Sequence, residues 1–156
     1  MPRRKYSKTQ RNPVDPVYND PVIGSTINKI LKRGKKSVAE RIMYEALETV
    51  EKKTGKPARD VYILAIKNVA PTVQVKSKRV GGATYQVPIE IEDDRRQALA
   101  ITWLMQFAEA RKGAGFAQKF AEEIIEASEN RGGAIKKKID THKMAEANKA
   151  FSHYRF

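Results

Sequence analysis

The sequence lacks cysteine altogether and contains only two histidines among its 156 residues. Without cysteine there is no disulfide bond, no thiolate zinc site and no cysteine nucleophile. His142 and His153 have no metal-ligand or acid–base partners at the usual spacings around them. The GxxxxGK[ST], GxGxxG, GxSxG and HExxH motifs are also missing. We therefore predict a non-enzymatic binding protein with no catalytic residue, no metal site and no cofactor.

No apolar run is long enough to cross a bilayer, and the first residues lack the apolar core of a secretory signal. Acidic residues are absent before Asp15 and between Asp60 and Glu90. The chain carries a net charge of +13 and has a pI near 10.0, and such a field attracts phosphate backbones or anionic membranes. With 40% hydrophobic residues it can still bury one modest core. These features predict a single basic domain that binds a polyanion and does not span a membrane.

The N-terminal segment, residues 1–18, is predicted to be a basic flexible arm, and residues 19–156 a single helical RNA-binding domain. Pro2, Pro13 and Pro16 disfavour a helix in the arm, and its apolar content is low. Its cations are Arg3, Arg4, Lys5, Lys8 and Arg11.

Apolar residues at helical spacing predict a mainly α fold of about six helices, with one protruding β-hairpin between the third and fourth helices. Asp20, followed by proline, is a typical N-cap for the first helix. Ser37 and Glu40 form a capping box that is expected to open the second helix. Lys35 and Lys36 then precede a helix N-terminus, where backbone N–H groups favour anions, so they are a candidate phosphate site. Two solvated loop lysines are the alternative.

The hairpin is predicted at residues 72–91, where apolar and polar residues alternate on both sides of Gly81-Gly82. A two-residue loop would place Val75 opposite Pro88 and mix apolar with polar positions. A three-residue loop places Val75 opposite Ile89 and keeps one face apolar, so we predict the three-residue loop.

Cations lie toward the tip of this hairpin and at its root. Lys76, Lys78 and Arg79 favour a cationic arm that is offered to a polyanion, while a solvated edge hairpin that carries lysine for solubility is an equal alternative. Arg95 and Arg96 follow in the first turn of the fourth helix, which Asp93 or Asp94 is expected to cap. Cations there oppose the helix dipole, which indicates a purpose other than stability.

The last two helices are predicted to differ in charge. The fifth helix should expose an acidic face that points away from the polyanion and consists of Glu122, Glu123, Glu126 and Glu129. The last helix is basic, and the rings of its C-terminal residues alternate with charges, a mixture suited to stacking on bases. Phe151 is expected instead to fold back on the core.

Four stretches resemble bacterial-type small-subunit ribosomal protein seven, in order along essentially the whole chain. They are ILKRGKKSVAERIMYEAL (30–47), RVGGATYQVPIEI (79–91), RRQALAITWL (95–104) and THKMAEANKAFSHYR (141–155). The resemblance implies a structural ribosomal protein that binds the 3′ major domain of the small-subunit ribosomal RNA and nucleates assembly of the subunit head. It also implies a hairpin near the exit-site tRNA and the mRNA path. Small-subunit proteins nine and eleven would be neighbours, in the cytoplasm of a bacterium or in an organelle.

The RNA-binding residues that the resemblance implies are basic and agree with the charge pattern. They are Arg3, Arg4, Lys5, Lys8, Arg11, Lys35, Lys36, Lys76, Lys78, Arg79, Arg95, Arg96, Arg111, Lys112, Lys136, Lys143, Lys149 and Arg155. A DNA-binding architectural protein, with the same arm and a wing-like hairpin, is the alternative function.

Overall fold

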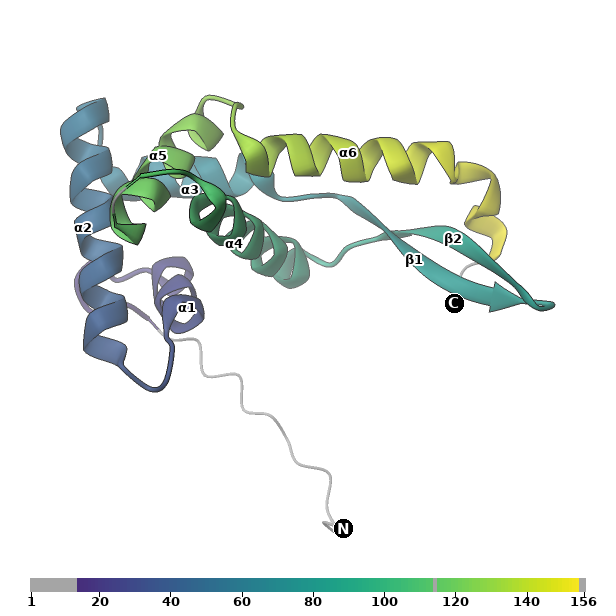
Figure 1. Cartoon of the computed structure of the whole chain (residues 1–156), viewed down its shortest axis with the longest axis horizontal. Helices are drawn as coiled ribbons and strands as arrows, with labels where there is room; N and C mark the ends of the chain where they lie inside the picture. The colour runs from purple at the N-terminus through teal and green to yellow at the C-terminus, as the bar shows by residue number, and fades with distance from the viewer. Residues whose placement is uncertain (1–13, 114, 155–156) are drawn as a thin grey trace, which may run out of the picture.

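A computed structural model of the chain describes residues 14–113 and 115–154. Within them the mainly α fold is confirmed, with six α-helices, a terminal 3₁₀ helix and a hairpin between the third and fourth helices. The elements are α1 (Pro21–Ile30), α2 (Lys36–Thr54), α3 (Ala58–Val69), β1 (Val73–Val80), β2 (Ala83–Glu90), α4 (Asp93–Ala110), α5 (Phe116–Ser128), α6 (Gly133–Ala147) and η1 (Lys149–Tyr154). Figure 1 shows a helical body at one end and the hairpin projecting from it, with α6 alongside.

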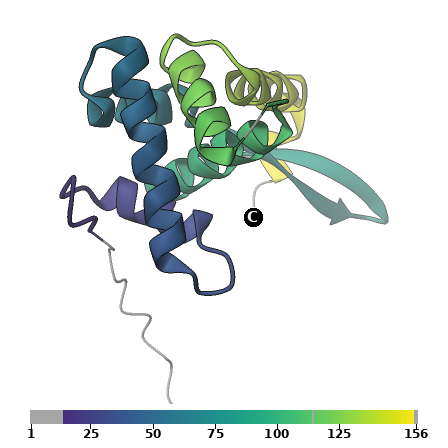
Figure 2. The same ribbon diagram turned by 60° about the vertical axis from the view of Figure 1, so that its left-hand side comes forward.

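The core lies among α1 to α5 and the first turn of α6, and α5 packs against α2, α3 and α4 (Figure 2). Tyr62 and Phe120 are its largest fully buried side chains, and their rings meet edge to face at 6.3 Å. The Tyr62 hydroxyl shares a 2.5 Å hydrogen bond with the hydroxyl of Thr26, which is also buried. Because each polar atom in this pair has a partner, the core avoids the cost of burying an unsatisfied hydroxyl.

Two of the three expected helix caps are wrong. Asp20 does cap α1, since its Oδ1 accepts from the backbone N–H of Val22 at 2.7 Å. The N-cap of α2 is Lys35 rather than Ser37, because a turn with positive φ at the two preceding residues starts the helix two residues earlier. The N-cap of α4 is Glu92, without a side-chain cap, and Asp93 instead pairs with an arginine one turn on.

The register of the hairpin also differs from the prediction. Val75 lies opposite Pro88, and the loop has two residues. Gly81 and Gly82 have φ of 57° and 89°, and positive φ at both loop positions is what a tight type I′ turn requires. The geometry of the turn therefore sets the register, at the expense of a uniformly apolar face.

The segment before α1 packs on the body, although the sequence placed residues up to 18 in the arm. Asp15 is only 2% exposed. Its carboxylate accepts from the backbone N–H of Tyr18 at 2.8 Å and from the Tyr44 hydroxyl at 2.6 Å. These contacts tie residues 15–18 to α2. The predicted arm residues Arg3, Arg4, Lys5, Lys8 and Arg11 lie outside the described residues.

Candidate nucleic-acid interface

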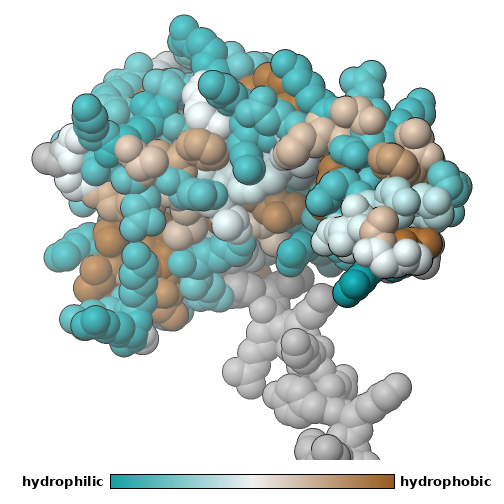
Figure 3. All heavy atoms as spheres, turned by 45° about the vertical axis from the view of Figure 1, so that its right-hand side comes forward, coloured by the Kyte–Doolittle hydropathy of each residue, from teal (hydrophilic) through white to brown (hydrophobic). Residues whose placement is uncertain are grey.

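Most of the predicted RNA-binding residues in the described part of the chain are exposed and have no carboxylate partner. They are Lys35, Lys76, Arg79, Arg95, Lys112, Lys136, Lys143 and Lys149. They come from the α1–α2 loop, the hairpin, both ends of α4, α6 and η1. Figure 3 shows hydrophilic residues over most of the face that it presents, with apolar patches between them. The fold thus offers positive charge on several separate elements.

The α1–α2 loop presents its two lysines differently. Lys35 is the exposed N-cap of α2 and makes no side-chain cap hydrogen bond. Lys36 lies 3.5 Å from Glu40 one turn along the helix, but its side chain is 66% exposed. Exposed pairs of this kind contribute about 0.3–0.5 kcal/mol. Such a weak contact leaves Lys36 available to a stronger anionic ligand.

A cationic pair at the crossing of α1 and α4 escaped the sequence analysis. Lys29 Nζ donates to the backbone carbonyl of Ala98 at 2.5 Å and also contacts Thr102 Oγ1. Burial lowers the pKa of Lys29, and the nearby charge of Arg95 lowers it further. No described carboxylate lies within 4.0 Å of either cation. The residues are far apart in sequence, so only the packing of α1 on α4 reveals them as neighbours.

The hairpin cations divide into two kinds. Lys76 and Arg79 are exposed on β1. Lys78 is half-buried, and its Nζ donates to the backbone carbonyl of Tyr154 in η1 at 3.1 Å. The tail therefore folds onto the hairpin, and Phe151 contacts Tyr85 of β2 rather than the helical core that we expected.

Arg111, another predicted RNA-binding residue, belongs to a partly buried ion-pair network. Its guanidinium donates to Glu123 Oε2 at 2.7 Å and contacts both carboxylate oxygens of Glu126. Hydrogen bonding to Glu126 raises the pKa of Arg111, and the same bond lowers the pKa of Glu126. Glu123 is 1% exposed and also accepts from the backbone N–H of Ala134 at 2.9 Å. The predicted exposed acidic face is thus wrong at Glu123, which joins the end of α4 to α5 and α6.

Two side chains of α6 attach that helix to the root of the hairpin. Lys138 Nζ donates to the backbone carbonyl of Asn68 at 2.7 Å, and burial lowers the pKa of Lys138. His142 Nε2 accepts from the backbone N–H of Thr72 at 3.1 Å. Burial, and then the charge of Lys138, lower the pKa of His142. His142 thus serves as a neutral acceptor, while Lys136 and Lys143 remain exposed.

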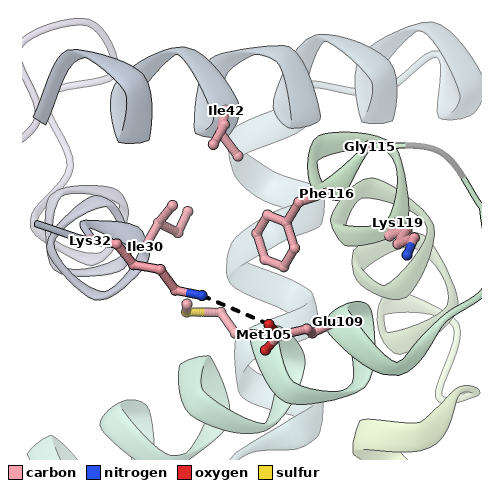
Figure 4. Close-up of a pocket in the computed structure, with 8 residues that line it drawn as sticks. All are labelled: Ile30, Lys32, Ile42, Met105, Glu109, Gly115, Phe116 and Lys119. Atoms are coloured by element: carbon pink, nitrogen blue, oxygen red, sulfur yellow. Dashed lines mark ion pairs between the residues drawn. The ribbon is translucent and has the colours of Figure 1, made fainter. Parts of the chain in front are cut away.

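An apolar cleft of about 360 Å³ opens between α2, α4 and α5 beside the end of α1 (Figure 4). Ile42, Met105 and Phe116 line it. An ion pair also lines it, in which Lys32 Nζ lies 3.8 Å from Glu109 Oε1. Both charged side chains are largely exposed, at 81% and 72%.

Across residues 14–113 and 115–154, no three potential metal ligands gather into a metal-binding group. No helix among the same residues has the length and apolar character needed to cross a membrane.

Within residues 14–113 and 115–154, the chain is a basic helical body with a projecting hairpin, and several of its elements carry exposed cations without a carboxylate partner, the class of surface that suits a polyanion. A family model described as "Ribosomal protein S7p/S5e" matches residues 2–149. The small ribosomal subunit protein uS7 of Gloeothece citriformis is 51% identical over 100% of both chains. The protein of the same name from Methylibium petroleiphilum is 52% identical, also over 100% of both. The chain therefore belongs to the ribosomal protein S7p/S5e family and is a structural protein of the small ribosomal subunit.

Proposed function

We propose that the chain binds the small-subunit ribosomal RNA directly, in its 3′ major domain, and nucleates assembly of the subunit head. The hairpin would lie near the exit-site tRNA and the mRNA path, and small-subunit proteins nine and eleven would be neighbours. Family membership supports the ribosomal setting. The observation that supports the RNA-binding part is a set of exposed cations on separate elements of the body and hairpin, for which the described residues provide no carboxylate partner.

The mechanism that this arrangement supports is recognition of the shape of a folded RNA. Cations on separate elements neutralise phosphates of different strands at once, so binding depends on how the RNA brings those strands together. Lys35 and Lys36 would contact one strand, and Lys29 with Arg95 a second site near the hairpin root. The hairpin, α4, α6 and the tail would supply Lys76, Arg79, Arg96, Lys112, Lys136, Lys143 and Lys149.

Arg111, Lys78 and Arg155 are not part of this set of cations. Arg111 and Lys78 hold the protein's own structure together through the contacts described above. Arg155, like the arm cations, lies outside the described residues, and its RNA contact stays a prediction.

Competition binding tests the proposal. A folded RNA junction from the 3′ major domain is labelled, and the chain is titrated at fixed salt against unlabelled junction RNA or duplex DNA of equal length. We expect the RNA junction to compete at least tenfold better than the duplex. Equal competition would contradict shape recognition of RNA and favour the DNA-binding alternative. Co-sedimentation with small subunits in low and high salt provides a second, independent measurement.

A further inference from the structure

Among the described residues, the C-terminal helix η1 packs against the outer half of the hairpin. Tyr85 of β2 lies 5.2 Å, centroid to centroid, from Phe151 and 5.2 Å from Tyr154. Phe151 and Tyr154 also stack on each other at 6.5 Å. The three rings form one cluster that joins β2 to the end of the chain.

The second strand is held by the same helix. Lys78 of β1 lies opposite Tyr85 in the register. Its Nζ donates to the backbone carbonyl of Tyr154 at 3.1 Å. Both strands therefore meet η1 at the same level of the hairpin.

Between this level and the root, α6 packs along the hairpin, and Val87 of β2 is fully buried. At the root, Lys138 and His142 bind the backbone of residues 68 and 72. A cleft of about 410 Å³ follows, lined by Pro88 and Ile89 of β2 and by Ala145 of α6 among others. The hairpin is thus attached to α6 at its root and to η1 nearer its tip, and this cleft lies between the two sets of contacts. A two-stranded ribbon is only marginally stable in water by itself, so contacts with η1 help to hold its outer half in place.

We infer that η1 is a clamp that fixes the direction of the hairpin, with Tyr85 as the central positioning residue. The clamp holds Lys76 and Arg79, which are exposed on β1, in a constant position relative to the body. A binding group that is fixed in advance loses less conformational entropy when its partner arrives. The link to RNA affinity rests on the proposed function, whereas the clamp itself is a property of the free protein.

Hydrogen exchange on the full chain tests the clamp without RNA. Tyr85→Ala removes the ring from the cluster, and Tyr85→Phe keeps it. Thr84→Ala is the matched control, because Thr84 is an exposed neighbour whose side chain lies on the other face of the hairpin. We expect the β1 and β2 amides of Tyr85→Ala to exchange about tenfold faster or more, because no ring then packs on Phe151 and Tyr154. The exchange rates of the α2 to α5 amides should be unchanged. Tyr85→Phe and Thr84→Ala should exchange like the parent protein throughout.

Unchanged exchange in the hairpin of Tyr85→Ala would overturn the clamp. Faster exchange throughout the molecule would instead report global destabilisation. For that case Phe151→Ala provides the second test, because this ring lies at the end of the chain and outside the buried core. Faster exchange confined to the hairpin in Phe151→Ala supports the clamp, and unchanged exchange overturns it.

A mutant cycle then measures the consequence for RNA. The Lys76→Ala, Arg79→Ala double substitution is made in the parent chain and in Tyr85→Ala, and the affinity for the RNA junction is measured in all four. We expect the double substitution to weaken binding about tenfold in the parent and less than threefold in Tyr85→Ala. Equal losses in both backgrounds would overturn the positioning role. No loss in the parent would contradict the RNA role of the hairpin, while the exchange measurements would still decide the clamp.

Discussion

The buried ion pair between Arg111 and Glu123 provides the sharpest test of how this fold is held together. Glu123 is 1% exposed, and the side chain of Arg111 is 22% exposed. Arg111→Ala leaves the Glu123 carboxylate buried, and of its donors among the described residues the backbone N–H of Ala134 remains. Breaking one side of a buried pair costs about 3–5 kcal/mol. Because this donor remains and the guanidinium is partly exposed, we expect a loss of about 3 kcal/mol in the free energy of unfolding.

That loss is large for a domain of this size, whose total stability is typically about 5–15 kcal/mol. Urea denaturation followed by far-UV circular dichroism measures it, with the parent and variant compared at the same pH and salt. Lys52→Ala is the matched control, because its partner Glu48 is an exposed carboxylate and the side chains are 72% and 64% exposed. We expect the control to leave the urea midpoint almost unchanged, because solvent screens so exposed a pair.

A double substitution separates the cost of an unpaired charge from the value of the pair. Arg111→Met combined with Glu123→Gln removes both charges at similar volume, so it should be less destabilising than Arg111→Ala alone. A loss below about 1 kcal/mol for Arg111→Ala, equal to that of the exposed control, would refute the reasoning. A reduced salt dependence of RNA binding in folded Arg111→Ala would instead make Arg111 a phosphate ligand.

Two further predictions concern RNA binding and pH. Replacing Lys35 and Lys36 by alanine should lower RNA affinity and flatten the slope of log K against log salt by up to about 1.4–1.8, or roughly 0.7–0.9 for each phosphate that is no longer neutralised. A slope that matches that of Lys52→Ala would show that the two lysines are only solvated. The pKa of His142 is lowered in the folded state, where its Nε2 accepts from the backbone N–H of Thr72. Below about pH 6.5 the unfolded chain therefore binds more protons at this residue than the folded chain does. Stability from this group is therefore full above the unfolded pKa and is lost as pH falls through the folded pKa. His142→Gln should make the urea midpoint depend less on pH between about pH 5 and 7. A variant whose midpoint changes with pH as that of the parent does would contradict this role.

The local pattern of the sequence was sufficient for the elements and for the overall distribution of charge. Helical periodicity predicted six helices, and glycine between alternating segments predicted the hairpin, because both signals depend on residues within a few positions. The absence of acids before Asp15 and between Asp60 and Glu90 likewise located two basic regions. Asp20 succeeded as a cap because its hydrogen bond reaches only two residues along the chain.

Tertiary packing decided which charged side chains are exposed and which are paired inside the protein. Arg111 and Glu123 are both ordinary surface residues by sequence, yet the meeting of α4, α5 and α6 buries their contact. Lys29 joins Arg95 only because α1 crosses α4. The energy of such contacts depends on burial and on partners distant in sequence, and periodicity reports neither.

Some features of the hairpin likewise follow from the local sequence, and others depend on tertiary packing. Its existence follows from the sequence, but its register follows from two loop residues with positive φ, whose backbone geometry outweighs the preference for an apolar face. Its position in space depends on Tyr85 meeting the end of the chain. The sequence by itself determined that a basic ribbon exists, and only the tertiary structure decided where it is held, because that depends on contacts between residues far apart along the chain.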